Sequence, residues 1–233
     1  MTKLYYETIS PSMHEVLLKM MDIHELSSFR LVGGTALSLQ LGHRESIDID
    51  LFTDKSIDFT LISNQIKNLF SKSRLLSASA NGQTWNVEGV KVDIYDWHVP
   101  FLQDPLIVDN IRMASIEEIA TYKFEALTGR RSEKDFIDIA EILKHKAFKD
   151  LLKIFRQRYP FIQTGAFMPY LLSPHLFERD ETIIRHTLET FDLAAQRIQE
   201  AIQNFEKEEV EATRQKNEDR DARLAELLKR KKK

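Results

Sequence analysis

The sequence of this 233-residue chain predicts an α/β fold of the α+β type, in which a small mixed sheet is flanked by helices and followed by a C-terminal helical region. Two observations lead to this prediction. An apolar run at residues 29–32 stops at Gly33 and Gly34, as a buried strand does where the backbone must turn tightly. Polar and apolar residues then alternate strictly over residues 46–52, which is typical of a strand with one buried face.

One helix is expected before the first strand in the sequence and another after it. Ser10 and Pro11 fit the N-cap and the first position of a helix, and apolar residues at helical spacing extend this helix to about Leu26. We expect it to pack behind the first strand. A second helix is expected at residues 35–41, directly after the two glycines.

The first candidate functional residues lie on the alternating strand, residues 46–52. Its expected core-facing residues are Ile47, Ile49 and Leu51, and its expected open-facing residues are Ser46, Asp48 and Asp50. Two neighbouring carboxylates repel each other unless a cation joins them, and hard oxygen ligands suit Mg²⁺ or Mn²⁺. The amides of a Gly-Gly turn and a helix N-terminus bind phosphate. Each motif alone is commonly a plain turn or a solvated strand face, but together they predict a metal ion beside a phosphate-binding turn.

A helix and a hairpin are expected next. Asp58 fits the N-cap of a helix whose apolar positions recur every three or four residues. A strand at residues 74–80 meets Asn81 and Gly82, a strong hairpin signal, and residues 83–88 are expected to return antiparallel to it.

The strand expected at residues 90–97 carries a third carboxylate. Asp93 shares one face with the polar residues of this strand, while the apolar residues point to the core. Asp93 is therefore a third candidate carboxylate beside Asp48 and Asp50, with a surface aspartate as the alternative interpretation. Asp96 lies on the opposite face of the same strand.

Helix signals dominate the rest of the chain after one further strand, which is expected at the sheet edge over residues 106–113. We therefore expect a core domain at residues 1–113 and a helical domain at residues 114–233. Ser115 and Glu118 form a capping box that starts the helix carrying Lys123 and ending at Gly129. The remaining helices are expected at residues 133–145 (capped by Ser132), 148–158, 165–172 and 179–230, the last as one or two helices with Ile183, Ile184 and Leu188 among its apolar positions.

The end of the chain is dominated by charge. After Glu206 apolar residues are scarce, which indicates either a solvated helix or a frayed tail. The closing basic run at residues 229–233 is expected to be solvated, with contact to an RNA backbone as the alternative.

Composition sets further limits. Hydrophobic residues make up 42% of the chain, which is enough for a core, and the net charge of −3 argues against a general basic coat for nucleic acid. The absence of cysteine excludes disulfides, zinc-thiolate sites and cysteine nucleophiles, and favours an intracellular location. We see no signal-peptide core and no membrane-spanning apolar run, so we expect a cytoplasmic protein without a membrane partner.

Two blocks of the sequence resemble the AbiEii/AbiGii toxin family of nucleotidyltransferases, within the DNA polymerase beta-like superfamily. The first block comprises Gly33-Gly34-Thr35, His43-Arg44, Ser46 and Asp48-Ile49-Asp50-Leu51-Phe52. The second block, residues 119–143, contains Lys123 and the segment Lys134-Asp135-Phe136-Ile137-Asp138. Thr35 stands where many relatives have another small residue, and the spacer before Asp48 is near the long end of the usual range.

The resemblance implies a two-metal nucleotidyltransferase that uses a nucleoside triphosphate. The implied metal ligands are Asp48, Asp50 and Asp93, and the implied nucleotide-binding residues are Gly33, Gly34, Thr35, Arg44, Ser46 and Lys123. Lys123 would offset charge on the leaving pyrophosphate, or else is a solvated lysine. Asp138 is the implied residue that orients Lys123 or the acceptor, while Asp135 is expected to support a helix N-terminus and His43 to be structural.

The family further implies a toxin that adds nucleotides to an RNA such as tRNA and is restrained by a cognate antitoxin protein. Arg130, Arg131 and Lys134 would give this RNA a basic rim, although such a turn is also a common solvated feature. The nearest alternatives are a small molecule, as in aminoglycoside nucleotidyltransferases, or a protein as acceptor. A non-catalytic module that binds nucleotide or a partner is a further alternative. A haloacid-dehalogenase-type phosphatase fits poorly, because Phe52 departs from its pattern and Gly33-Gly34 has no role in it.

Overall fold

A computed structural model describes residues 3–187 and 190–231 of the chain, and side chains of the last helix through Asp221 and at Arg223. Its sheet has seven strands in the order β3-β4-β5-β2-β1-β7-β6. The strands are β1 (Arg30–Val32), β2 (Asp48–Thr53), β3 (Ser73–Ser79), β4 (Gly82–Val87), β5 (Val90–Asp96), β6 (Leu106–Val108) and β7 (Ile111–Met113). β2 pairs parallel with β5 and β1 parallel with β7, whereas the other neighbours are antiparallel, which confirms the predicted mixed sheet.

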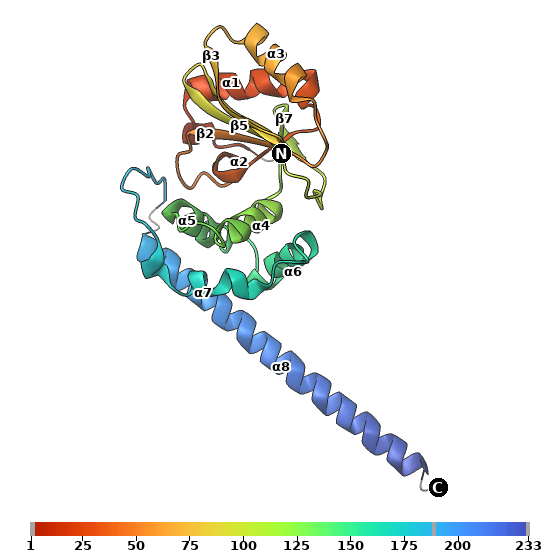
Figure 1. Cartoon of the computed structure of the whole chain (residues 1–233). Helices are drawn as coiled ribbons and strands as arrows, with labels where there is room; N and C mark the ends of the chain where they lie inside the picture. Colours follow the sequence, from red (N-terminus) through yellow and green to blue (C-terminus); the bar gives the residue numbers. More distant parts are fainter. Residues whose placement is uncertain (1–2, 188–189, 232–233) are drawn as a thin grey trace.

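Helices cover both faces of this sheet (Figure 1). The α-helices are α1 (Pro11–Met21), α2 (Gly33–Leu41), α3 (Phe59–Leu69), α4 (Ile116–Ala126), α5 (Glu133–Ile142), α6 (Phe148–Arg158), α7 (Met168–Leu171) and α8 (Phe191–Lys231). Short 3₁₀ turns lie at Tyr6–Thr8, His24–Leu26, Thr164–Ala166 and Pro174–Leu176. α1 and α3 lie on one face, and α2 lies on the other, where α4 and α5 pack against it and α6, α7 and α8 lie beyond them.

Most of the expected helix starts are confirmed, with their hydrogen bonds. The Ser10 and Asp58 side chains accept hydrogen bonds from backbone amides in the first turns of α1 and α3. Ser115 caps α4 in the same way, but the Glu118 half of the capping box is not formed. The buried Glu118 carboxylate instead contacts Arg158 of α6 and the amide of Leu102, so it ties the helical region to a loop beside the sheet.

Three strand predictions need correction. Ile47 does not face the core, because β2 begins only at Asp48 and the Ile47 side chain is 68% exposed. Residues 106–113 form a hairpin of two strands, since Asp109 and Asn110 both adopt the left-handed backbone conformation that a two-residue turn needs. The β3–β4 turn lies at residues 80–81, one residue before the expected site.

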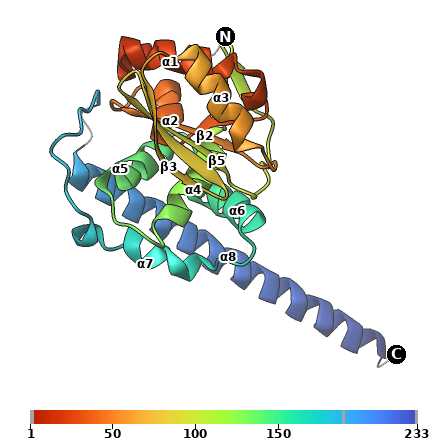
Figure 2. The ribbon, with the colours of Figure 1, turned by 45° about the horizontal axis from the view of Figure 1, so that its top comes forward.

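The helix expected from residue 179 begins only at Phe191. Residues 178–187, which we call the strap, instead run as a non-helical segment beside α5 (Figure 2). Ile183 and Ile184 lie in this strap, and Leu188 lies outside the described residues. The helix expected at residues 165–172 is likewise shorter, consisting of a 3₁₀ turn and α7.

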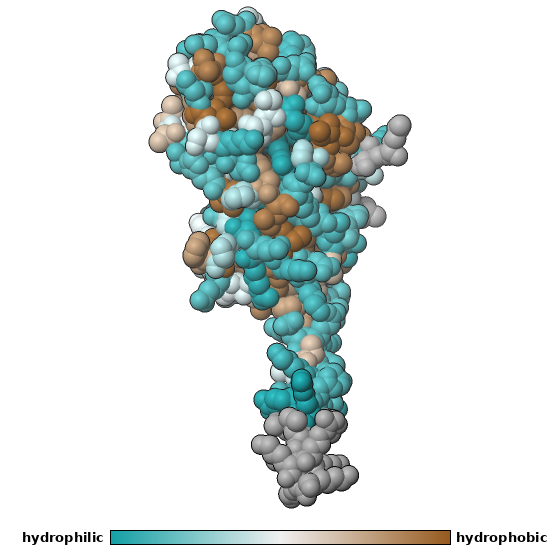
Figure 3. Space-filling model, turned by 90° about the vertical axis from the view of Figure 1, so that its right-hand side faces the viewer, coloured by the Kyte–Doolittle hydropathy of each residue, from teal (hydrophilic) through white to brown (hydrophobic). Residues whose placement is uncertain are grey.

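The last helix projects from the body of the protein (Figure 1). Its first turns bury Phe191, Ala194, Ile198 and Ile202 against the helical region. Every residue from Glu206 to Asp221 is exposed, so the charged segment is a solvated helix over this range. Its surface is almost entirely hydrophilic (Figure 3). The side chains of the basic run at residues 229–233 lie outside those described.

Candidate active site

The three expected carboxylates come together on neighbouring strands. β2 and β5 run parallel with Asp50 directly opposite Asp93, and Asp48 precedes Asp50 by two residues on the same face. All three line a cavity of about 390 Å³. The opposite face of both strands is packed into the core, where Ile49 and Val92 are fully buried. The alternation read from the sequence therefore sets the acidic face of this cavity.

The two glycines make the close approach of α2 to these strands possible. Gly33 has φ +69°, and a Cβ atom there would lie 2.3 Å from Oδ2 of Asp50. A Cβ atom on Gly34 would lie 2.5 Å from Nη2 of Arg44. Any larger residue at either position would displace Asp50 or Arg44. The N-terminal amides of α2 are thus held beside the acidic strand.

Thr35 and Ser46 fix the segment that enters β2. The Thr35 hydroxyl is buried, lies 2.8 Å from Oγ of Ser46 and donates to the carbonyl oxygen of Asp48. Its side chain is therefore fully used inside the protein, and only its backbone amide is available for a phosphate. Ser46, in contrast, lines the cavity.

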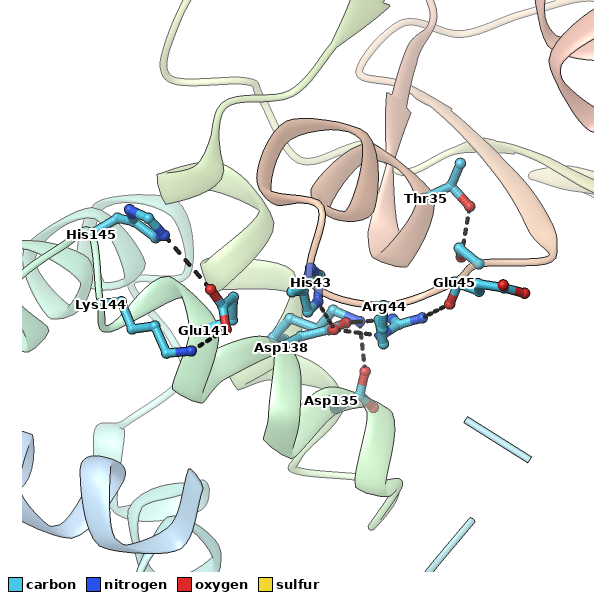
Figure 4. A network of polar contacts seen from close by, with 11 residues as sticks. Thr35, His43, Arg44, Glu45, Asp135, Asp138, Glu141, Lys144 and His145 are labelled. Atoms are coloured by element: carbon cyan, nitrogen blue, oxygen red, sulfur yellow. Dashed lines mark hydrogen bonds and ion pairs between the residues drawn. The ribbon is translucent and has the colours of Figure 1, made fainter. Parts of the chain in front are cut away.

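Asp138 of α5 is the centre of a buried ionic network (Figure 4). Its two oxygens accept from Nε and Nη2 of Arg44 at 2.7 and 2.8 Å, and Nε2 of His43 lies 2.8 Å from Oδ1. Nζ of Lys123 lies 2.6 Å from Oδ2. Burial alone would raise the pKa of Asp138, but the charges of Arg44 and Lys123 outweigh it and hold the pKa well below its usual range.

Asp135 extends this network to the cavity. It accepts from Lys123 at 2.8 Å and from Nε and Nη2 of Arg130 at 2.7 and 3.1 Å. Burial lowers the pKa of Lys123, but the charges of Asp135 and Asp138 raise it by more than burial lowers it. The net shift of this pKa is upward, so the ammonium stays charged. Lys123, Arg130 and Asp135 line the cavity, whereas Asp138 is fully buried behind them.

The acidic side of the cavity is under electrostatic strain. Burial, and then the neighbouring Asp93 carboxylate, raise the pKa of Asp50 from 3.8 to about 6. Lys91, two residues before Asp93 on the same strand face, lies 2.5 Å from Oδ2 of Asp93 and also lines the cavity. Its position follows from the alternation that places Asp93, so the sequence already held this signal.

The strap forms a wall of the cavity that the sequence did not indicate. Thr182, Ile183 and Ile184 line it, and the backbone of the strap bonds to the segment before β2 through Glu45 N to Ile184 O, 2.8 Å. Its other anchor is the buried carboxylate of Glu133, which accepts from the amide of Asp180 at 2.5 Å and pairs with Arg179 and Arg185. The sequence instead predicted a helix over these residues, and nothing local in it indicates the irregular backbone of the strap.

The carboxylate oxygens of the cavity suit a hard divalent cation whose other ligands are substrate phosphates and water. Among the described side chains, no group of three Asp, Glu or His residues is placed to hold a metal ion, and this includes Asp48, Asp50 and Asp93. Mg²⁺ commonly binds through one or two carboxylates, water and substrate phosphates rather than in a cage made only of protein ligands. Asp48 and Asp50 offer carboxylates of this kind beside the amides of α2.

The structure thus brings nearly all sequence-predicted residues to one place. The cavity wall includes Gly34, Arg44, Ser46, Asp48, Asp50, Asp93 and Lys123, with Arg130 and Lys134 of the expected basic rim. Gly33 contacts Asp50 from behind, and Asp138 contacts Arg44 and Lys123. Their catalytic and binding roles stay predictions.

Comparison with known proteins agrees with this fold. The chain is 33% identical over 151 residues to an uncharacterized protein of Aquifex aeolicus (strain VF5), a match covering 62% of this chain and 73% of that protein. The structure of the present chain resembles that of MenT4, a nucleotidyltransferase toxin from Mycobacterium tuberculosis H37Rv. The TM-score is 0.58, the identity is 11%, and the match covers 82% of this chain and 80% of MenT4. JHP933 from Helicobacter pylori aligns with a TM-score of 0.53, 18% identity and coverage of 88% and 93%.

The fold and the family define the class of protein as a nucleotidyltransferase. Residues 16–229 match the family described as nucleotidyl transferase AbiEii toxin of type IV toxin–antitoxin systems, and the chain belongs to this family. The predicted family is thereby confirmed. No helix in the described part of the chain has both the length and the apolar character needed to cross a membrane.

Proposed function

We propose that the protein transfers a nucleoside monophosphate from a nucleoside triphosphate to an acceptor hydroxyl, with Mg²⁺ or Mn²⁺ as cofactor. One observation carries this proposal: Asp50 and Asp93 stand opposite each other on parallel strands, in a cavity whose other side holds Lys123 and Arg130. An acidic wall facing a basic wall suits a ligand that joins metal-bound phosphate to a departing anion.

Each residue has a distinct part in this reaction. The acceptor oxygen forms a bond to the α-phosphorus, the bond from this phosphorus to the bridging oxygen breaks, and pyrophosphate leaves with the bonding electrons. A divalent ion, when bound, supplies Lewis-acid polarisation of the phosphate. Asp48 and Asp50 would hold the ion, Asp93 would accept the proton of the acceptor hydroxyl, and the α2 amides would hold the outer phosphates.

The basic wall binds the leaving group. Lys123 and Arg130 share the Asp135 carboxylate, and Lys123 and Arg44 share the Asp138 carboxylate, so three cations against two buried anions keep a positive balance toward pyrophosphate. Asp138 acts by holding Lys123 and Arg44, because it contacts both side chains without reaching the cavity itself. We therefore assign it a positioning role.

We infer an RNA, such as tRNA, as acceptor, and activity as a toxin restrained by an antitoxin protein. Family membership supports this inference. So does the charge at the cavity mouth, where Arg130 and Lys134 lie on the cavity wall and Arg131 and Arg179 lie on the segments next to it. Cations at this rim would contact the RNA backbone, while the net charge of −3 limits such contact to this part of the surface.

The test is label transfer. Each α-labelled nucleoside triphosphate is incubated with protein, Mg²⁺ or Mn²⁺, and total cellular RNA, and pyrophosphate is measured in parallel. Wild type and the control Asp104→Ala, at an exposed aspartate outside the cavity, are expected to label an RNA band, and Asp48→Ala is not. Pyrophosphate release with a small-molecule or protein acceptor alone would overturn the RNA assignment. Folded protein that releases no pyrophosphate under any condition would overturn the transferase proposal.

A further inference from the structure

Lys91 places a cation against Asp93, the third carboxylate of the cavity. Its side chain lies on the open face of β5, and its ammonium is 2.5 Å from Oδ2 of Asp93. The other oxygen of Asp93 accepts a hydrogen bond from Thr84 Oγ1 at 2.6 Å. Both oxygens of this carboxylate are therefore already engaged by the protein.

Asp48 and Asp50 differ from Asp93 in this respect. Among the described residues, no hydrogen bond or ion pair engages either of their carboxylates, and both face the cavity. Two free carboxylates beside a phosphate-binding turn are the donors that Mg²⁺ takes together with substrate phosphates. The third carboxylate, in contrast, is already neutralised by a cation.

Charge balance leads to the same conclusion. Three carboxylates and one ammonium leave two negative charges on the acidic wall, which one divalent ion neutralises. A second ion on Asp93 would lie within a few ångströms of the Lys91 ammonium, and like charges this close in a partly buried site repel each other strongly. Lys91 would have to leave before such an ion could bind.

We propose that the Lys91 ammonium takes the place of the second divalent ion, so that the chain binds one ion per nucleotide, at Asp48 and Asp50. The Lys91–Asp93 pair then faces the acceptor hydroxyl. This inference rests on the proposed function and departs from the two-metal site that the family resemblance implies. The alternative is that Lys91, whose side chain is 48% exposed, moves away from Asp93 on metal binding, so that a second ion binds there. The number of bound ions distinguishes the two.

The test counts metal ions rather than turnover. The full-length protein is dialysed to equilibrium with Mn²⁺ and a nucleoside triphosphate analogue carrying a methylene group between the α- and β-phosphates, and bound manganese and nucleotide are measured. We expect one manganese per bound nucleotide in wild type and two in Lys91→Met. Two ions about 3.5–4 Å apart also give a magnetically coupled paramagnetic resonance spectrum, which we expect only from the variant.

The controls separate the outcomes. Lys91→Arg keeps the charge, Lys67→Met removes an exposed lysine from α3, and both are expected to retain one ion. Two ions in wild type, or one ion in folded Lys91→Met, overturns this inference and leaves the proposed transferase intact. Bound nucleotide without any manganese overturns the metal site of the proposed function itself. If Lys91→Met does not fold, the wild-type count decides.

Discussion

Gly33 and Asp50 are packed so closely that a single added carbon would not fit between them. The Cα of Gly33 approaches the carboxylate from the start of α2, and a Cβ atom would lie 2.3 Å from Oδ2. This contact connects the phosphate-binding turn directly to the proposed metal ligand. The position of Asp50 therefore depends on the absence of a side chain at residue 33.

Gly33→Ala is expected to lower nucleotidyl transfer by 100-fold or more, because Asp50 must move and a misplacement of about 1 Å costs about that factor. The matched control is Gly89→Ala. Gly89 also has positive φ, at +89°, but a Cβ there meets nothing within 4 Å. Both variants carry a similar backbone strain of about 1 kcal/mol in thermal unfolding. Equal activity of the two would contradict the proposed coupling of Gly33 to Asp50.

Mn²⁺ binding is expected to weaken as the pH falls through about 6. Burial and Asp93 raise the pKa of Asp50 from 3.8 to about 6 in the folded protein. Because its pKa is higher in the folded state, ionisation of Asp50 opposes folding. The folded protein therefore has its full stability from this group below pH 4 and loses it as the pH rises through 6. A cation binds the ionised form, so the rise in melting temperature caused by Mn²⁺ is expected to be larger at pH 7.5 than at pH 5.

Asp50→Asn tests the same group without metal. The variant is expected to be more stable than wild type at pH 7.5 by about 1 kcal/mol, less than the full linkage value because the carboxyl faces the cavity. It is also expected to lose the pH-dependent response to Mn²⁺. The measurement is denaturant unfolding at both pH values, with Asp104→Asn as control. A variant less stable than wild type at pH 7.5 would show that the carboxylate is not strained.

Asp138→Ala is expected to destabilise the fold by about 3 to 5 kcal/mol, because it leaves His43, Arg44 and Lys123 buried without their shared anion. Asp138→Asn keeps the shape and part of the hydrogen bonding, so its loss is expected to be smaller. Denaturant unfolding measures both, and Asp104→Ala is again the control. If Asp138→Ala were as stable as this control, the network would have no structural importance.

Local patterns in the sequence were sufficient to predict much of the site. Strict alternation placed Asp48 and Asp50 on one face of their strand and Asp93 on one face of its own, and the family resemblance brought these two strands together. Caps located the starts of α1, α3 and α4. These features depend on residues close together in the chain. The partners of Asp138 lie on another element, 94 and 95 positions away, so no local pattern reveals that its carboxylate is shared by Arg44 and His43.

Apolar residues in non-helical segments were the main source of error. Ile184 precedes Leu188 by four residues, the spacing of a helical face, yet the strap that contains Ile184 is held by long-range contacts to Glu45 and Glu133. Ile47 continues the alternation of β2 by type, but the strand pairs only from Asp48 onward. In each case tertiary contacts, which a single sequence does not display, overrode the local pattern.

The Glu133 carboxylate is expected to hold the strap against α5. It accepts from the amide of Asp180 and pairs with Arg179 and Arg185, so Glu133→Gln removes the charge that both arginines share. We expect faster amide hydrogen exchange over residues 178–187 and, since Ile184 lines the cavity, a higher KM for the nucleotide with a smaller change in kcat. The control, Glu141→Gln, changes a buried glutamate of the same helix that pairs with Lys144 instead. Because both variants neutralise one α5 carboxylate, equal exchange over the strap in the two would mean that Glu133 is not its anchor.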